Sequence, residues 1–415
     1  MTAVVLPDIA HPATYAQGVP HEEFARMRAT APVSWVEEPL LERHSAAGRT
    51  VQRGTGFWAV TTHEEIIEVS RRPEDFSSAL KGAFLADPRT QADLQTARQL
   101  LVNMDAPQHS RIRKLVTSVF TPRAIRELTG SVQRHAAEVV ARAVARDGFD
   151  AVADLAAELP LLVLSDLLGM PREDRHLLYR WSNNLVGFDD PEYGGGDIEA
   201  YRRTFGEAFQ YALKIAYARR EHPASDLISV LANAEVDGKR LADREFCQFW
   251  LLLVVAGNET TRHLLSNTVH MLLTDAALRE EFGRVPVERA VEEFLRLVTP
   301  IMQFRRTATR DVTLAGQPIQ SGDKVVLYYI SGNRDERVFT TPQRAVLDRD
   351  PNPHLSFGIG PHFCLGAHLA RMEAASMLEA LRPHLPRLRL AGPVVRLESN
   401  FVNGVKSMPV LVGSS

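Results

Sequence analysis

The C-terminal quarter of the chain contains a glycine-rich loop that leads into a cysteine and then into a predicted helix. Residues 357–371 read FGIGPHFCLGAHLAR. After Gly366 the residues are mostly Ala, Leu, Met, Glu and Arg, which predicts a helix that continues to Arg382 and is stopped by Pro383. Cys364 is therefore expected at the N-terminus of this helix, where free backbone N–H groups and the helix dipole favour an anion. A thiol in that position loses its proton easily and becomes a strong metal ligand.

The glycines of this loop indicate a flat partner. Gly358 and Gly360 let the backbone bend beneath a planar group with no side chains in the way, and Gly366 lets the helix pass close to it. Together with Cys364, these residues predict a thiolate presented to one face of a planar metal cofactor. The alternative is a glycine-rich turn that ends in a buried structural cysteine, and for a lone cysteine that interpretation would be the better one.

The loop resembles the haem-binding loop of the cytochrome P450 family, whose pattern is Phe-Gly-x-Gly-x-His-x-Cys-x-Gly. Every fixed position of that pattern is filled in this chain. The resemblance implies haem b (iron protoporphyrin IX) as the cofactor, with Cys364 as the metal ligand. It also implies further residues that contact the haem, namely Phe357, Gly358, His362, Gly366 and, from the central helix, Ala256.

Composition argues against several other classes of protein. The formal net charge is −3 over 415 residues, so nothing indicates a nucleic-acid partner or an acidic membrane surface. The only cysteines are Cys247 and Cys364, which fits a reducing compartment without disulfides, and two thiols cannot alone ligate an iron–sulfur cluster. No Gly-x-Gly-x-x-Gly lies between a predicted strand and helix, so we expect no flavin or nicotinamide domain. Electrons for a haem would then come from a separate partner.

We expect a soluble, cytoplasmic protein with one domain, residues 1–415. The start of the chain has neither a basic region nor a long apolar run, so we expect no signal peptide. The longest apolar block, Phe249–Ala256, is too short to span a bilayer. No repeats or low-complexity linkers interrupt the chain.

Hydrophobic patterning predicts mostly helices with a few short strands, a fold that is mainly α with small β-sheets (α+β). The resemblance implies the cytochrome P450 fold, with a long central helix over a buried haem. A loop rich in glycine, Asp189–Gly196, is flexible enough to be the hinge of a lid. The predicted elements are helices at His21–Arg28 and His63–Ser70, a mixed connection over Phe76–Asn103, helices over Gln108–Asp275 broken at Pro122, Gly169–Pro171 and Asp189–Gly196, and strands at Gly56–Thr61, Arg306–Leu314, Val325–Ile330 and Phe401–Val412.

The central helix is expected to begin at an N-cap, Asp243, and to continue for about thirty residues. Its middle is apolar on all sides, so the helix must be buried. Three residues, Gly257, Glu259 and Thr260, do not fit that pattern. Glycine weakens a helix, and the hydroxyl of Thr260 can bond the carbonyl of Ala256. We therefore expect a local bulge or groove.

This stretch resembles the Ala-Gly-x-Glu/Asp-Thr-Thr element that the family has on the distal side of the haem. The resemblance assigns Thr260 to hydrogen-bonding dioxygen and Glu259 to proton delivery. Splitting an O–O bond requires protons at the distal oxygen while bulk water is excluded. On its own, the stretch is equally consistent with a surface Glu-Thr-Thr-Arg patch on an amphipathic helix.

Glu293 and Arg296 lie three residues apart on one predicted helix. Such a pair can be an ordinary salt bridge on the helix surface, or a buried pair that supports the fold. The family has a buried Glu-x-x-Arg pair that a later arginine completes, and the resemblance assigns that position to Arg344. The family usually follows this arginine with phenylalanine, whereas Ala345 stands here. All three residues are expected to support the fold and not the chemistry.

Haem carries two propionates whose burial requires cationic or hydrogen-bonding partners. The resemblance to the start of the family's C-helix implies His109 and Arg113 as two of these partners. His362 of the cysteine loop is another, and Arg306 is assigned by its position in the chain. The adjacent Arg305 leaves open which arginine binds the propionate. For each residue, a solvated basic side chain is the alternative.

Substrate-facing residues are expected by position alone. Three lie on the central helix and three lie in two later segments, where the hydrophobic core is an equally good interpretation. These candidates are Leu252, Val255 and Ala256, and then Ile301, Met302 and Val402.

The resemblance implies a haem-thiolate monooxygenase that inserts one oxygen atom from O2 into a C–H bond of a hydrophobic small molecule. Electrons would come from NAD(P)H through a ferredoxin and a ferredoxin reductase. An acidic ferredoxin could meet Arg111, Lys114 and Arg371 on the cysteine side. We expect a monomer.

The runs at residues 253–262 and 304–307 look most similar to actinobacterial hydroxylases of sterols and methyl-branched lipids, so a sterol, a terpenoid or a branched lipid is favoured. Tailoring of a secondary metabolite such as a macrolide or peptide is the alternative within the family. A peroxide-driven peroxygenase is disfavoured because it would not need Glu259 and Thr260. A haem sensor is disfavoured because no spare length exists for an output domain, and a cysteine hydrolase because Cys364 and His362 would rarely face each other on so tight a loop.

Overall fold

A computed structural model describes residues 8–46, 48–117, 120–224, 226–236 and 239–413. The first seven residues, where the sequence predicts no signal peptide, lie outside these ranges. Among the described residues, no helix combines the length and the apolar character needed to cross a membrane.

Helices make up most of the fold, as predicted. Several are capped by side chains in the expected way; the carboxylate of Asp197, for example, accepts the N–H groups of Glu199 and Ala200. The helices are α1 (His21–Thr30), α2 (His63–Arg71), α3 (Gln91–Ala97), α4 (Gln108–Thr117), α5 (Pro122–Glu127), α6 (Thr129–Val144), α7 (Glu158–Leu167), α8 (Arg175–Val186), α9 (Ile198–Glu221), α10 (Leu227–Asn233), α11 (Asp243–Thr274), α12 (Ala276–Phe282), α13 (Val287–Val298), α14 (Tyr329–Gly332) and α15 (Ala367–Leu381).

The strands form one larger sheet and several small ones. In the larger sheet the order is β1-β4-β12-β9-β5, where β12 runs parallel to β4 and the other neighbours are antiparallel. The strands are β1 (Val33–Val36), β2 (Leu40–Ser45), β3 (Gly48–Arg53), β4 (Phe57–Val60), β5 (Phe76–Ser77), β6 (Gly148–Asp150), β7 (Glu235–Val236), β8 (Lys239–Arg240), β9 (Gln303–Ala308), β10 (Val312–Leu314), β11 (Gln317–Ile319), β12 (Lys324–Tyr328), β13 (Leu388–Leu390), β14 (Val395–Arg396), β15 (Val405–Ser407) and β16 (Pro409–Val412).

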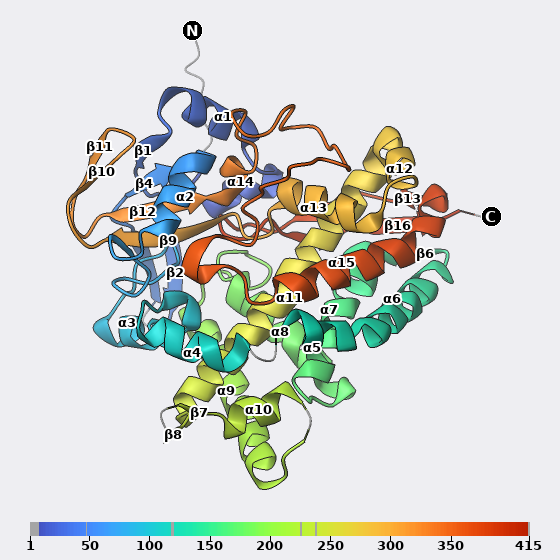
Figure 1. The fold of residues 1–415 in the computed structure, drawn as a ribbon, viewed down its shortest axis with the longest axis horizontal. Coiled ribbons are helices and arrows are strands. Elements are labelled where there is room, and N and C mark those ends of the chain that lie inside the picture. Colours follow the sequence, from blue (N-terminus) through green and yellow to red (C-terminus); the bar gives the residue numbers. More distant parts are fainter. Residues whose placement is uncertain (1–7, 47, 118–119, 225, 237–238, 414–415) are drawn as a thin grey trace.

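The long helix α11 runs through the middle of the molecule (Figure 1). The larger sheet lies to one side of it, and α6, α7 and α15 lie to the other. The C-terminal half of α11 packs through Leu265 and Val269 into a core shared with α6, α13 and α15. Its N-terminal half packs through Phe246 and Trp250 into a second core shared with α8 and α9. A helix that is apolar on all sides therefore joins two cores, as its sequence requires.

Two expectations about α11 are wrong in detail. The N-cap is Ala242, and Asp243 is the first helical residue, whose carboxylate accepts hydrogen bonds from Tyr217 and Arg220. The helix is α-helical throughout, so, of the expected bulge or groove, the bulge does not form. Gly257 instead allows a close approach to α7, because a Cβ there would lie 3.3 Å from Cδ1 of Leu164.

The helix after the cysteine loop is confirmed, with a small difference at its end. α15 ends at Leu381, and the chain continues as a 3₁₀ turn over Arg382–Arg387 that contains Pro383. Proline removes the N–H that the next helical hydrogen bond would need, which explains the change.

The buried Glu-x-x-Arg pair is present, but its third member is not the predicted one. Arg296 forms a two-pronged contact with Glu293 at 2.7 and 2.8 Å, and both side chains are inaccessible to solvent. The second cation is Arg349, whose Nε lies 3.1 Å from Oε2 of Glu293. Arg344 has an exposed side chain and contributes only its carbonyl, which accepts from Arg296. Spacing along the sequence cannot show which arginine the irregular segment turns inward.

A buried carboxyl group connects α15 to α11. Glu373 is 3% exposed and shares a hydrogen bond with Thr261 of α11. Burial raises the pKa of Glu373 to about 8, and the bond to Thr261 opposes that rise only in part. The group is therefore mostly protonated at neutral pH, which avoids an unpaired charge between the two helices.

Replacing Arg349 should destabilise the fold more than replacing Arg344. We expect Arg349→Ala to cost about 2 kcal/mol, because a nearly buried carboxylate loses one of its two cations. Arg344→Ala, the matched control, should cost less than about 0.5 kcal/mol because the exposed side chain is not used. Chemical denaturation followed by circular dichroism measures both, and equal losses would contradict the assignment.

The pH dependence of stability should contain a contribution from Glu373. The folded protein keeps this proton up to about pH 8, whereas an unfolded chain loses it near the ordinary value of 4.5. The contribution of Glu373 to the free energy of unfolding is therefore fully present below pH 4.5. It falls as the pH rises from 4.5 to about 8, by up to about 1.4 kcal/mol per pH unit. Glu373→Gln should remove this slope in unfolding free energies measured from pH 5 to 8. Parallel profiles for the two proteins would refute the buried protonated state.

Candidate active site

The cysteine loop is tightly packed on one side and open on the other. Gly358 and Gly360 have φ values of +67° and +74°, which favour glycine. A Cβ at Gly360 would lie 2.5 Å from the carbonyl oxygen of Ser70, so α2 presses directly on the loop. A Cβ at Gly366 would meet no atom within 4 Å. The open side at Gly366 fits the predicted planar group, which needs a surface free of side chains.

The thiol of Cys364 is less acidic than the sequence predicts. Cys364 lies two residues before Gly366, the N-cap of α15, and its N–H donates to the carbonyl of Phe357 at 2.8 Å. Burial raises the pKa of Cys364, while the Gly366 amide and the charges of Arg113 and Arg371 act in the opposite direction. The helix N-terminus alone therefore does not deprotonate the thiol, and that expectation is wrong. A coordinated metal cation would supply the missing stabilisation of the thiolate.

Four predicted propionate partners converge beside this loop. His109 and Arg113 come from α4, Arg306 from β9 and His362 from the loop itself. The rings of His109 and His362 lie 4.3 Å apart. Burial, followed by the charges of Arg306, His109 and Arg113, lowers the pKa of His362 to about 2. The four groups therefore lie close enough to repel one another.

Within the part of the chain that the structure describes, no carboxylate forms an ion pair with this basic cluster, although the charge of Asp105 acts on His109. Nε2 of His109 is buried there without a hydrogen-bond partner. The carboxylate of Asp105, close by in the sequence, already accepts the hydroxyl of Ser77 and the backbone N–H of Ser78. Arg306 donates to the carbonyl of Arg305 but has no ion pair to a described carboxylate. Two buried propionates would satisfy these groups, so the residues present fit a haem.

The structure separates the two adjacent arginines of β9. Successive residues of a strand point to opposite faces, so Arg305 and Arg306 face different sides of the sheet. Arg305 is 1% exposed and forms an ion pair with Asp87 at 2.8 Å. Arg306 is therefore the arginine left available to an anion, which supports the residue chosen from the sequence.

Part of α11 faces open space although the helix lies inside the molecule. Ala256 is exposed, and Leu252, Val255 and Thr260 are half-buried, while most of their neighbours on α11 are buried. Residues 252, 256 and 260 are spaced by four, so they share one face of the helix. The hydroxyl of Thr260 donates to the carbonyl of Ala256 at 2.7 Å, as predicted. This face matches the predicted substrate stripe.

Glu259 does not share that open face. It is 1% exposed, and its Oε2 accepts from Nη2 of Arg262 at 2.5 Å and lies 3.2 Å from Nε2 of His263. Burial alone would raise the pKa of Glu259, but Arg262 and His263 outweigh it and the net shift is downward. Arg262 also donates to Asn183 of α8 at 2.7 Å. The carboxylate is therefore ionised and held in a buried polar network between α11 and α8.

Two of the later substrate candidates belong to the core. Ile301 and Val402 form an isolated bridge, and the N–H of Met302 donates to the carbonyl of Phe401, so the two segments do lie side by side. Met302 and Val402 are at most 1% exposed and pack among other side chains, so their assignment as substrate-facing residues is wrong. Ile301 is half-buried and stays a prediction.

Three phenylalanines next to these segments were missed by the sequence analysis. Phe84, Phe304 and Phe401 meet with ring centroids 5.3 to 6.2 Å apart, and all three are partly exposed. Phe304 lies two residues before Arg306 and therefore points to the same face of β9. No local pattern could reveal this group, because its members come from three segments that are far apart in the sequence.

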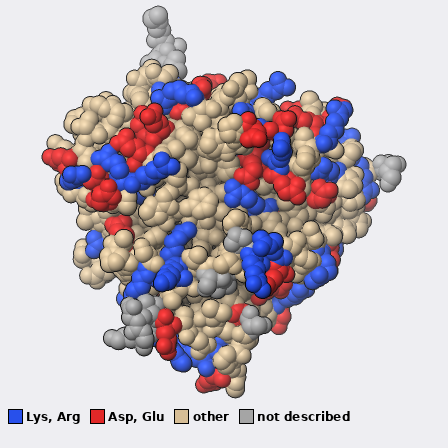
Figure 2. Space-filling model, viewed as in Figure 1, with Lys and Arg blue, Asp and Glu red and all other residues tan. Residues whose placement is uncertain are grey.

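The face that carries α4 and α15 has several Lys and Arg groups around a mostly uncharged centre (Figure 2). Lys114 is exposed, and Arg111 lies 3.6 Å from Glu245. Arg371 is committed to an internal role, since it contacts Glu292 at 2.6 Å and its guanidinium lies 4.4 Å from the Phe357 ring centroid. Of the three basic residues predicted to meet a partner, Arg371 is therefore the least available.

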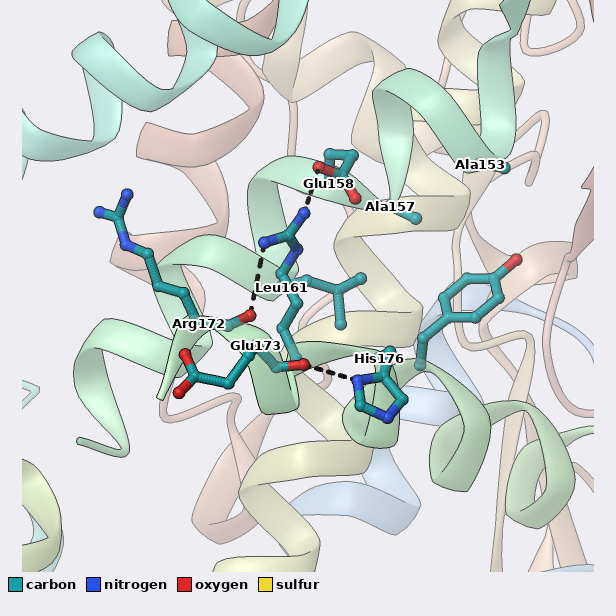
Figure 3. A pocket seen from close by; sticks show the side chains of 9 residues that line it. Ala153, Ala157, Glu158, Leu161, Arg172, Glu173 and His176 are labelled. Atoms are coloured by element: carbon teal, nitrogen blue, oxygen red, sulfur yellow. Dashed lines mark hydrogen bonds and ion pairs between the residues drawn. The ribbon is translucent and has the colours of Figure 1, made fainter. Parts of the chain in front are cut away.

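A separate cavity of about 440 Å³ lies beside α7 and α8 (Figure 3). Two of its charged groups, Arg175 and Glu158, form an ion pair with each other at 3.6 Å. Nδ1 of His176 lies 2.6 Å from the carbonyl of Glu173. None of the residues predicted for the site lines this cavity, so the cavity is not the candidate active site.

Known proteins resemble this chain over nearly its whole length. A family model described as Cytochrome P450 matches residues 197–382. The steroid C26-monooxygenase of Mycobacterium tuberculosis is 38% identical over 407 residues, covering 97% of this chain and 92% of that protein. The linalool 8-monooxygenase of Pseudomonas putida is 36% identical over 414 residues, covering 98% of each. The structure of Mycobacterium marinum cytochrome P450 CYP268A2 in complex with pseudoionone has a TM-score of 0.88 at 38% identity, covering 99% of this chain and 98% of that one.

Proposed function

Because this chain belongs to the cytochrome P450 family of monooxygenases, we propose that it hydroxylates a C–H bond of a hydrophobic sterol, terpenoid or methyl-branched lipid. The basic cluster around the cysteine loop carries the proposal, since two buried and two half-buried groups with no ion pair to a described carboxylate suit the two carboxylates of a haem. The half-buried face of α11 and the three phenylalanines support an apolar substrate. The steroid and linalool monooxygenases among the relatives support the same class.

The cofactor in this proposal is haem b, held by Cys364 as the metal ligand and by four propionate partners. When bound, a thiolate-ligated haem supplies the activation of O2, so that one oxygen atom enters the substrate and the other leaves as water at the expense of two electrons and two protons. The loop backbone at Gly358 and Gly366 leaves one face clear for it. The propionate partners are His109, Arg113, Arg306 and His362.

The residues of α11 would manage the protons. Thr260 lies on the open face; its hydroxyl hydrogen goes to the carbonyl of Ala256, so its oxygen can accept a hydrogen bond there, and rotation of the hydroxyl away from Ala256 would let it pass on a proton. Glu259 is ionised within the buried network, so it can accept a proton and hand it towards Thr260 by turning its side chain. The contacts of Asn258 with Ser182 and of Arg262 with Asn183 close the space between α11 and α8 and keep bulk water out.

Electrons would come from NAD(P)H through a ferredoxin and a ferredoxin reductase. The scarcity of cysteines and the lack of a dinucleotide fingerprint support an external donor. The exposed side chains of Lys114 and Arg111 on α4 support docking of an acidic protein. The same cysteine count supports a cytoplasmic location, and a monomer stays our expectation.

An optical titration tests the substrate class. The ferric protein is titrated with a sterol, an acyclic terpenoid, a methyl-branched fatty acid and a macrolide, and the Soret band is followed. We expect a low-spin to high-spin shift with one of the first three, because an apolar ligand displaces water from the open face of α11. A shift with the macrolide alone would replace the lipid proposal. A protein made with ample haem that shows no Soret band would refute the haem assignment.

Variants on α11 test the proton route. Thr260→Ala should reduce product formed per NAD(P)H consumed by roughly tenfold or more, since a proton-passing group is lost. Thr260→Ser keeps the hydroxyl and should retain most of the coupling. Glu259→Gln should also reduce coupling while the Soret shift with substrate is kept. Normal coupling in Thr260→Ala would refute this route.

A further inference from the structure

A buried histidine lies beside Glu259 and has no role in the proposal above. His263 is on α11, one helical turn after Glu259, and is 1% exposed. Its Nε2 lies 3.2 Å from Oε2 of Glu259. Its Nδ1 lies 3.2 Å from the backbone N of Val405 in β15. The ring therefore spans the distance between the carboxylate and a separate strand.

The contact with β15 fixes which ring nitrogen carries the hydrogen. The backbone N–H of Val405 can only donate, so Nδ1 of His263 must accept. Burial, helped by the charges of Arg262 and Arg396, lowers the pKa of His263 to about 4 despite the opposing effect of Glu259. The neutral ring then carries its hydrogen on Nε2 and donates it to Glu259. Nη2 of Arg262 is 3.3 Å from the same nitrogen, but both atoms carry hydrogens in this tautomer, so that contact is not a hydrogen bond.

The strand that fixes the ring is itself held in place. A Cβ at Gly404 would lie 2.7 Å from Cβ of Leu397 and 3.2 Å from Nε2 of His263, so the backbone passes very close to the ring. On the other side of Val405, the ammonium of Lys406 forms an ion pair with Asp190 at 3.0 Å. Asp190 is inaccessible to solvent and lies in the loop between α8 and α9, which the sequence predicts as a hinge.

A second contact ties the same loop to the segment 398–406. The other carboxylate oxygen of Asp190 accepts the backbone N–H of Glu398 at 3.0 Å. Asp190 thus holds the segment near both ends. Asp190 of the α8–α9 loop contacts the segment 398–406. Within that segment Val405 contacts His263, and His263 in turn contacts Glu259.

We propose that His263 is a positioning residue, which holds the carboxylate of Glu259 through its Nε2–H in a place set by the backbone of Val405. This inference rests on the proton-handling role proposed for Glu259. With the Nε2–H in place, Oε2 of Glu259 is held between two donors, Arg262 and His263, while Oε1 accepts from Asn258 at 3.3 Å. Without it, Arg262 is the one remaining donor to Oε2 among these contacts, so the position from which the carboxylate turns towards Thr260 is no longer fixed.

Two amide substitutions separate the two hydrogen bonds of the ring. The side-chain amide of glutamine reaches the position of Nε2, so His263→Gln keeps a donor to Glu259 and loses the acceptor for Val405. The shorter His263→Asn has the opposite effect. Each variant loses one buried hydrogen bond, so their thermal stabilities and haem contents should be similar. A difference in catalysis between them therefore reports on the contact with Glu259.

We expect His263→Asn to reduce product formed per NAD(P)H consumed by roughly tenfold, while His263→Gln stays within about twofold of the parent. The solvent deuterium isotope effect on product formation should rise in His263→Asn only, because proton transfer becomes slower. ¹⁵N NMR of the histidine-labelled ferrous–CO holoenzyme should show the Nε2-protonated tautomer for His263. Equal coupling in both variants, or the Nδ1-protonated tautomer, would overturn the proposal.

The double variant Glu259→Gln/His263→Asn separates a failure of the role proposed for His263 from a failure of the role proposed for Glu259. If His263 acts only through Glu259, the double variant should be no worse than Glu259→Gln alone, whereas additive losses would refute the positioning role. If Glu259→Gln alone has no effect, the proposed role of Glu259 fails. If Glu259→Gln is impaired and His263→Asn is not, only the inference about His263 fails.

Discussion

Positive charge gathered without an anionic partner is the constraint on which the candidate site depends. Burying a guanidinium or an imidazolium costs free energy unless an anion or hydrogen-bond acceptors replace the lost water. The fold nevertheless brings Arg113 and Arg306 together with His109 and His362, and it keeps Asp87 and Asp105 occupied elsewhere. The two histidines respond by staying neutral. Such an arrangement favours an anionic ligand, which the carboxylates of the proposed haem would supply.

The central helix α11 has one face that borders open space and another that lies in a buried polar network. One face carries Leu252, Ala256 and Thr260 towards open space, and another carries Glu259 and Arg262 into a buried network with α8. A glycine at position 257 brings the helix against α7 at the same level. Gly257, Glu259 and Thr260 interrupt the apolar pattern of the helix. They are thus the positions where the helix contacts α7, contacts the buried network and borders the open space.

The sequence predicted the parts of the site that are local and failed where distant segments decide the geometry. The cysteine loop, the Thr260 hydroxyl bond and most helices depend on residues close together in the chain. The third arginine, expected at 344 and found at 349, depends on how an irregular segment turns. Met302 and Val402 were misassigned because a position in a segment does not tell which way a side chain points. The acidity of Cys364 was overestimated because the helix N-terminus was considered without the cost of burial.

Two neighbouring carboxylates on α13 brace the cysteine loop from both sides. Glu293 holds the segment before the loop through Arg349, while Glu292 holds α15 through Arg371 and also contacts His354. Each contact is made between side chains of the protein itself, so the segments before and after Cys364 are both tied to the same helix. The shape that the loop offers to a planar group is therefore set by α13, a helix that carries none of the residues expected to touch that group.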